Sequence, residues 1–205
     1  MGKALLDLGA NTYDSAQSIV TQADGKILIA GITDAQPTGG TGTSYNFGIV
    51  RLNADGSLDT TFGDIDTINS SLRNGKAMLD LGGNRNDLSY SIATQVNGKI
   101  LIAGETDAQP PGVRSYYLNY GIERLNADGS LDTTFGGTDT VNISLRTGKV
   151  LLDFGTTKDD RARSVVTQAD GKILVAGFTT AGPSGSNNNY GIVRLNADGS
   201  LDTSF

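Results

Sequence analysis

Short apolar runs alternate with polar turns along the whole chain, and no stretch has the spacing of an amphipathic helix. The runs at 15–22 and 27–30 flank Asp24-Gly25, a pair typical of hairpin turns because glycine tolerates a positive φ. A third run, at 47–52, follows a polar loop and precedes a second turn of the same kind. This pattern predicts short antiparallel strands joined by turns, and therefore an all-β chain.

The same pattern of apolar runs and polar turns occurs three times along the chain. Identical segments recur at Arg51–Thr60, Arg124–Thr133 and Arg194–Thr203. Such repetition marks a repeat architecture, in which units too small to bury their own apolar faces share one core. We therefore treat 1–205 as a single repeat array. Its repeats lie at 2–74, 75–147 and 148–205.

A repeat of about four short antiparallel strands favours a β-propeller, with one four-stranded blade per repeat. Two runs, 58–62 and 76–81, compete for the outer strand of the first blade. Both cannot belong to a simple meander, because five strands would leave the chain at the wrong end of the blade. We assign the outer strand to 76–81. We expect 58–62 to be an extended edge segment, with Phe62 closing the end of the blade.

This assignment makes the N-terminal run at 3–8 an outer strand without a blade of its own, and leaves the third blade without an outer strand. Three blades are too few to surround an axis, since propellers have about four to eight. We therefore predict a two-fold homodimer that forms one six-bladed ring, each N-terminal strand completing the last blade of the other chain. The alternative is a fragment of a longer propeller.

Composition narrows the possible functions. The net charge is −6 without a Lys/Arg cluster, which argues against nucleic acid and anionic membrane surfaces as partners. The chain has no Cys and no His, which excludes disulfides, thiolate metal sites and a Ser-His-Asp triad. No run approaches the about 18 apolar residues of a membrane helix, so we expect no membrane insertion. No signal segment precedes Gly2, which predicts a cytosolic, mature or excised chain.

Carboxylates are the remaining candidates for chemistry. Aspartates that recur identically in every repeat are weak evidence for a single active site, so we expect no enzyme activity, no catalytic residues and no cofactor; a carboxylate-based hydrolase is the least favoured alternative. The segment 53–59 alternates oxygen-bearing side chains as a calcium loop does, but it lacks the acidic twelfth ligand. We favour a hairpin turn and no metal site, with weak calcium binding as the alternative.

Three arginines lie in the middle of apolar strands, where a buried guanidinium needs a carboxylate partner. We predict ion pairs with the recurring aspartates; the alternative is a channel lined by three cations. Glycines in the two kinds of turn are expected to supply positive φ. The residues with a predicted structural role are Arg51, Arg124, Arg194, Asp59, Asp132, Asp202, Gly25, Gly98, Gly171, Gly56, Gly129 and Gly199.

The repeats differ most in two sets of loops. These are 34–46, 107–119 and 180–189, and 9–17, 82–90 and 155–163. The expected strand directions bring both sets to one face, and variable loops on a rigid frame are typical of binding surfaces. Tyr and Arg are common anchors of such surfaces. The candidate ligand-binding residues are Tyr45, Arg114, Tyr116, Tyr117 and Tyr190; neutral drift of exposed loops carries equal weight.

The motif Gln22–Gly31 followed by Arg51–Gly63, repeated through nearly the whole chain, resembles the bacterial delta-60 repeat family. The resemblance implies a β-propeller-like fold in large secreted or surface-attached proteins, hence an extracellular or cell-surface location, and implies no catalytic residues. The long connectors at 63–74 and 136–147 depart from the family. We expect a non-enzymatic binding or adhesion module for a protein or glycan. A purely structural self-assembling unit, as in a surface fibre, an oligomer or a designed consensus propeller, is the second hypothesis.

Overall fold

The computed structural model describes residues 2–9, 12–36, 43–63, 75–82, 85–109, 117–136, 148–155, 158–182 and 187–205. The strands in these ranges are β1 (Asp14–Thr21), β2 (Ile27–Thr33), β3 (Asn46–Leu52), β4 (Lys76–Leu79), β5 (Asp87–Thr94), β6 (Ile100–Thr106), β7 (Asn119–Leu125), β8 (Lys149–Leu152), β9 (Asp160–Thr167), β10 (Ile173–Thr179) and β11 (Asn189–Leu195).

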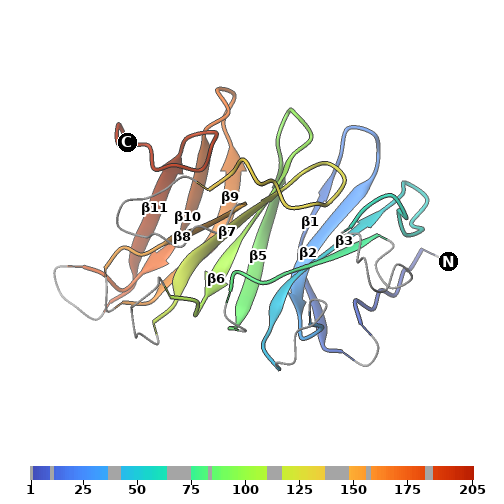
Figure 1. Cartoon of the computed structure of the whole chain (residues 1–205), viewed down its shortest axis with the longest axis horizontal. Coiled ribbons are helices and arrows are strands. Elements are labelled where there is room, and N and C mark those ends of the chain that lie inside the picture. Colours follow the sequence, from blue (N-terminus) through green and yellow to red (C-terminus); the bar gives the residue numbers. More distant parts are fainter. Residues whose placement is uncertain are drawn as a thin grey trace.

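The strands form three antiparallel sheets, which Figure 1 shows standing side by side from the N-terminal end to the C-terminal end of the chain. Two sheets have four strands, in the orders β1-β2-β3-β4 and β5-β6-β7-β8, and the third has three, in the order β11-β10-β9. The described ranges contain no helix, and so none that could cross a membrane. The predicted all-β architecture is confirmed, with each sheet a blade.

The outer strand of each complete blade comes from the start of the following repeat. β4 pairs with β3 from Phe47↔Leu79 to Val50↔Lys76, as predicted for the run at 76–81. Leu58 makes only an isolated bridge to Leu52, and Phe62 is buried with a relative exposure of 2%. The edge-segment interpretation of 58–62 is therefore confirmed.

The third blade has three strands, as predicted, and the run at 3–8, expected to pair with the last blade of another chain, is not paired as a strand within its own chain. The counterparts of this run, β4 and β8, each pair with the third strand of the preceding blade. The run instead lies against its own sheet, with Leu8 packed over Gly48 as Leu81 packs over Gly121. A Cβ on Gly48 would lie 2.6 Å from Leu8 Cδ2.

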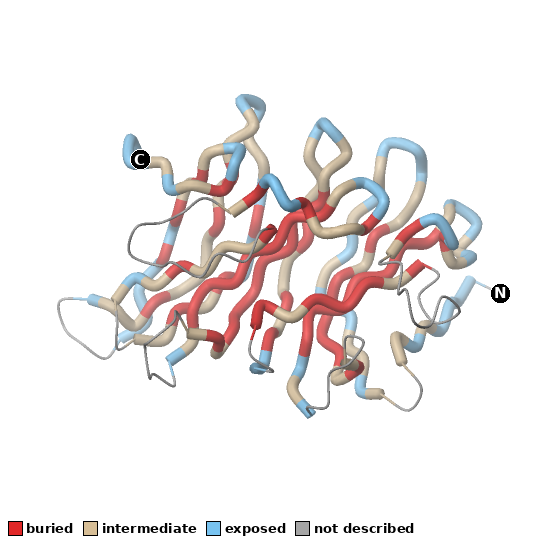
Figure 2. The backbone as a smooth tube through the Cα atoms, in the orientation of Figure 1, coloured by how far each residue is buried: buried red, intermediate tan, exposed pale blue. Residues whose placement is uncertain are grey.

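The core lies between the blades. One cluster joins Phe47 and Leu79 of the first blade to Ile92 and Ile100 of the second. A second cluster joins Tyr120 and its neighbours to the third blade. Strands β6 and β7 are buried at every position, which Figure 2 shows as continuous red in the central sheet. The middle blade is therefore covered on both faces, and the outer two are each covered on one.

Each blade begins with an irregular hairpin. The pairing of β5 with β6 shifts register between Ser89 and Ser91, and the two other hairpins shift at the matching place. Gly104 lies opposite this bulge, where a Cβ would lie far inside the van der Waals distance of the Leu88 carbonyl oxygen. Only glycine permits this close approach of two backbones.

Candidate functional site

The variable loops of neighbouring blades are hydrogen-bonded to one another at one end of the sheets. The Asp87 amide donates to the Tyr45 carbonyl at 2.8 Å, and the Tyr45 amide donates to Asn86 Oδ1 at 3.1 Å. The next junction repeats the link, since the Asp160 amide donates to the Leu118 carbonyl at 2.8 Å. We call the described residues of these loop sets the loop face. For these described residues, the prediction that the two loop sets lie on one face is confirmed.

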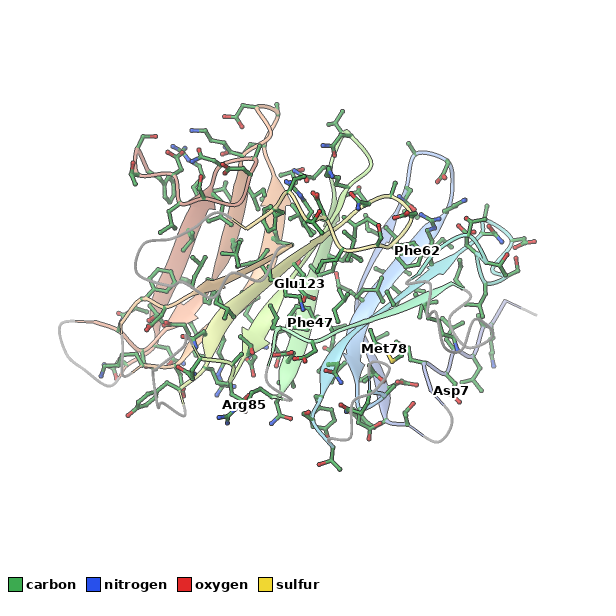
Figure 3. All side chains as sticks on the ribbon, viewed as in Figure 1. Asp7, Phe47, Phe62, Met78, Arg85 and Glu123 are labelled. Carbon is green, nitrogen blue, oxygen red and sulfur yellow. The ribbon has the colours of Figure 1, made fainter. Side chains whose placement is uncertain are left out.

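A polar pocket of about 370 Å³ opens on the loop face between the first two blades. Its lining residues are Thr43, Ser44, Arg85, Asn86 and Asp107. The Asn86 amide donates to Asp107 Oδ1 at 2.9 Å, which holds the carboxylate in place. Figure 3 labels Arg85 at the edge of the molecule, on the side where these loops lie. Residues that carry hydroxyl, amide, carboxylate and guanidinium groups thus line one small volume.

The predicted aromatic anchors are divided between two surfaces. Tyr45 is partly exposed on the loop face, where its ring packs edge-on against Tyr13 with centroids 5.9 Å apart. Tyr117 occupies the matching loop of the second blade and is partly exposed. Tyr190 lies instead on β11, on the open face of the third blade. The other two candidates, Arg114 and Tyr116, lie outside the described residues.

The predicted ion pairs form in all three blades. Arg51 Nε lies 2.7 Å from Asp59 Oδ2, and the pairs Arg124–Asp132 and Arg194–Asp202 each measure 2.6 Å. In each blade, the lysine that precedes β2, β6 or β10 also pairs with this carboxylate oxygen. Lys26 Nζ, for example, lies 2.9 Å from Asp59 Oδ2. Burial disfavours the charged form of Asp59, but hydrogen bonds from Thr61 and Lys26 and the charge of Arg51 hold its pKa well below the usual range.

The same arginines also join the blades, through a contact that we call the latch. Arg51 donates to the Ala127 carbonyl in the second turn of the next blade and stacks on Phe62, 4.6 Å from the ring centroid. The Gly63 amide donates to the Asp128 carbonyl of that turn at 2.9 Å. The second junction repeats the latch with Arg124, Phe135 and Gly136 on the turn 197–199. This geometry favours the structural role over a cation-lined channel.

The predicted turn glycines all have positive φ, between 81° and 90°. Within the second turn of the first blade, Asp55 Oδ1 accepts hydrogen bonds from the Ser57 amide and hydroxyl, at 2.9 and 2.6 Å. The oxygens that suggested a calcium loop therefore accept local hydrogen bonds, as expected of a hairpin turn. Within the described ranges, no three acidic side chains gather where they could hold a metal ion.

A charged cluster at the second junction was not predicted. Buried Glu105 of β6 lies 3.4 Å from both Arg161 and Arg163 of β9, and Arg163 stacks on the Tyr90 ring at 3.8 Å. Burial raises the pKa of Glu105, and the two arginines counteract part of that rise. The available signal was a glutamate within an apolar strand, at the position that holds Ile32 in the first repeat.

Two buried aspartates were also missed. Asp87 Oδ2 accepts a hydrogen bond from the Leu81 amide at 2.6 Å, and its other carboxylate oxygen accepts one from the Thr106 hydroxyl. Asp160 accepts a hydrogen bond from the Phe154 amide at 2.7 Å. Burial raises the pKa of Asp87 to about 8, although both hydrogen bonds favour the charged form. Burial likewise raises the pKa of Asp160 to about 6. These carboxyls fasten the segment that links one blade to the next.

A family model described as a domain of unknown function (DUF5122) beta-propeller matches three segments of the chain, residues 22–62, 95–135 and 168–205. These segments make up more than half of the chain, and each ends at the phenylalanine that stacks with a latch arginine. A search of curated proteins found no match. The family match confirms the predicted β-propeller repeats.

Proposed function

The chain belongs to this β-propeller family, and we propose that it acts as a non-enzymatic scaffold whose loop face binds a ligand rich in hydroxyl groups, such as a glycan. The observation that carries this proposal is the polar pocket between the first two blades. It gathers donors and acceptors from two repeats that are joined by backbone hydrogen bonds. A site held by a rigid frame needs little reordering when a ligand binds.

The chemistry of the lining suits such a ligand. Arg85 offers several donors in a fixed plane, Asp107 offers acceptors, and Thr43 and Ser44 offer hydroxyls that do both. The partly exposed ring of Tyr45 follows Ser44 directly, so an aromatic face borders the polar lining. Polar groups that fix orientation beside an aromatic surface are typical of small-ligand sites.

The recurring aspartates support a non-enzymatic role. Asp59 is engaged by Arg51 and Lys26, and Asp87 by the Leu81 amide and the Thr106 hydroxyl. These carboxyls therefore serve the junctions between blades. Conversion of a glycan by the wild-type protein, abolished by Asp→Asn changes, would contradict the non-enzymatic role.

A glycan array and a pull-down test the binding role. We expect Arg85→Ala to weaken binding of any array hit at least tenfold, because Arg85 lines the pocket and the change removes its guanidinium donors. Asp170→Asn, which also removes one charge but lies in a hairpin turn away from the loop face, serves as the matched control. Blank results in both assays, or equal binding by both variants, would overturn the proposal. Capture of a protein without any glycan hit would favour a protein ligand.

Self-assembly is the second candidate function, and the exposed apolar side chains of the two end blades favour it. We propose that two chains close one six-bladed ring, because both end blades expose apolar side chains. Light scattering at increasing concentration tests this. A discrete particle of twice the chain mass of 21.3 kDa supports the ring, whereas a growing series of sizes supports an open fibre.

We also propose a location for the parent protein. The resemblance to delta-60 repeats supports a parent protein that is secreted or attached to a bacterial surface. Fractionation of cells that express the parent protein tests it, and recovery in the cytosol alone would contradict the proposed location.

A further inference from the structure

We propose that the N-terminal segment and the latch of the third blade form an interaction surface for a second copy of this chain. In this surface, residues 3–6 become the outer strand beside the partner's β11, and Arg194 with Phe205 grips the partner's turn at 54–56. The inference rests on the two-chain ring proposed above and specifies its contacts. It is independent of what the loop face binds.

The two open faces of the chain are the two halves of a junction that the chain builds twice internally. On the first blade, Ile19 is 68% exposed, whereas its counterpart in the second blade, Ile92, is 6% exposed. On the third blade, Tyr190 is 94% exposed, whereas its counterpart Tyr120 is fully buried against the next blade. Stacking a third blade on a first blade would therefore cover both apolar faces, as their counterparts are covered at the two internal junctions.

The latch of the third blade is formed but grips no turn. Arg194 Nε lies 2.6 Å from Asp202 Oδ2, and its guanidinium stacks on Phe205 at 4.7 Å, as in the two complete latches. Yet Phe205 is 64% exposed, whereas Phe62 and Phe135 are buried. Arg194 Nη2 donates to Ser204 Oγ at 3.4 Å, but among the described hydrogen bonds Arg194 reaches no turn carbonyl, whereas Arg51 and Arg124 each reach one through Nη1.

The turn that would fill this latch lies at the other end of the chain. Gly56 has a φ of 86°, close to the 89° of Gly129 and 90° of Gly199, which the complete latches hold. A Cβ on Gly129 would lie 2.8 Å from the Phe62 ring, whereas a Cβ on Gly56 would meet no atom within 4 Å. The turn at 54–56 thus has the shape of a latched turn without the contact.

The register of the intermolecular strand follows from its two internal counterparts. Lys76 pairs with Val50 and Leu79 with Phe47, and the second blade repeats the alignment. The same alignment pairs Lys3 with the partner's Val193 and Leu6 with the partner's Tyr190. Leu5, which is almost fully exposed, then takes the place of the buried Met78.

Within these 205 residues, the first and third blades of one chain cannot meet. The second blade separates the first from the third, and the two termini lie at opposite ends of the row of sheets in Figure 1. Two chains, each supplying one first blade and one third blade, close with no edge left over. The closed ring removes the exposed strand edge of β11, which otherwise invites uncontrolled pairing.

Solution mass tests the surface. We expect the wild-type chain to be a discrete dimer, and Tyr190→Asp to shift it to monomer with at least a hundredfold weaker association. Val96→Asp places the same charge at an equally exposed site in a turn of the second blade and is the matched control. A wild-type monomer throughout the micromolar range, or an equal effect of both changes, would overturn the inference.

A glycine pair tests the latch itself. Gly56→Ala and Gly25→Ala each put a Cβ at positive φ with ordinary or no contacts inside the chain. Only Gly56 would face the partner's Phe205, so we expect Gly56→Ala alone to weaken dimerisation, by tenfold or more. A dimer equally tolerant of both changes would overturn the latch.

Engineered cysteines test the register, since the chain has no cysteine of its own. Ala4→Cys with Ile192→Cys places two thiols opposite each other in the proposed pairing, and oxidation should give a covalent dimer. Leu5→Cys with Ile192→Cys shifts one residue, which turns the thiols to opposite faces, and should not. Equal cross-linking by both pairs, cross-linking within one chain, or none would overturn the inference. In-register cross-linking in a series of growing assemblies would support the pairing and overturn the closed ring.

Discussion

Each latch arginine is paired with one aspartate of its own blade. Arg51 is nearly buried, and Asp59 is its only carboxylate partner among the described ion pairs. We expect Asp59→Asn to lower the free energy of unfolding by about 3 kcal/mol, because it leaves a buried guanidinium without a counter-charge. Urea denaturation measures the loss. The control Asp24→Asn, in an exposed turn, should change stability by less than about 0.5 kcal/mol, and equal costs would contradict this role.

The buried carboxyls of Asp87 and Asp160 should make stability fall as the pH rises. An aspartate in the unfolded chain has a pKa near 3.9, so a folded-state pKa of about 8 means that unfolding releases a proton between these values. Each such group then lowers the free energy of unfolding by about 1.4 kcal/mol per pH unit between its unfolded-state and folded-state pKa. For Asp160, the pH range in which unfolding releases a proton ends near pH 6. Asp59, with its lowered pKa, stays charged in both states here and loses its contribution only in stronger acid.

Thermal unfolding between pH 5 and pH 8 tests this expectation. The wild type should melt at a higher temperature at pH 5 than at pH 8. Asp87→Asn should flatten the slope over the whole window and raise the melting temperature at pH 8, because an amide resembles the protonated carboxyl. Asp160→Asn should flatten the slope only below about pH 6. A pH-independent wild type, or a less stable Asp87→Asn at pH 8, would show that the carboxyls are charged in the fold.

At the scale of the strands, the inner hairpin of each blade depends on one glycine. Gly104 faces the backbone of the bulge in β5, so Gly104→Ala must push two strands apart. We expect a loss of about 3 kcal/mol or a failure to fold, which exceeds the cost of overpacking a deformable core. Gly155→Ala is the matched control, since a Cβ there meets only ordinary contacts at 3.5 Å or more. Circular dichroism and urea titration of both variants would decide, and a stable Gly104→Ala would refute the close approach.

The strands also show how far the sequence could be interpreted. The Asp-Gly turns, the outer strand at 76–81 and the paired Arg51 were predictable because each follows from a local rule of turn geometry, chain direction or charge burial. The packing of the run 3–8 over Gly48 of its own sheet was not, because the sequence assigned this run only a pairing with another chain. The cluster around Glu105 was not either, since its partners Arg161 and Arg163 lie far along the chain and meet it only at a junction.

For the whole molecule, stability should vary from blade to blade. The middle blade is covered on both faces, and β11 is an edge strand with an open face. We expect amides of β11 to exchange with solvent at least tenfold faster than those of β7, since exchange follows local burial and pairing. Hydrogen exchange followed by mass spectrometry measures this at low concentration. Raising the concentration should protect β11 if chains pair there, and uniform protection at high dilution would contradict the gradient.

The borrowing of each outer strand from the following repeat has a consequence for how such proteins change in size. Cutting or fusing the gene at a repeat boundary passes through the connector and leaves every hairpin intact. Two copies fused head to tail would carry the strand at 3–6 into the third blade from within one polypeptide. Blade number could therefore grow by duplication alone, and the ring closure that we propose for two separate chains, which depends on their concentration, would become a property of a single molecule.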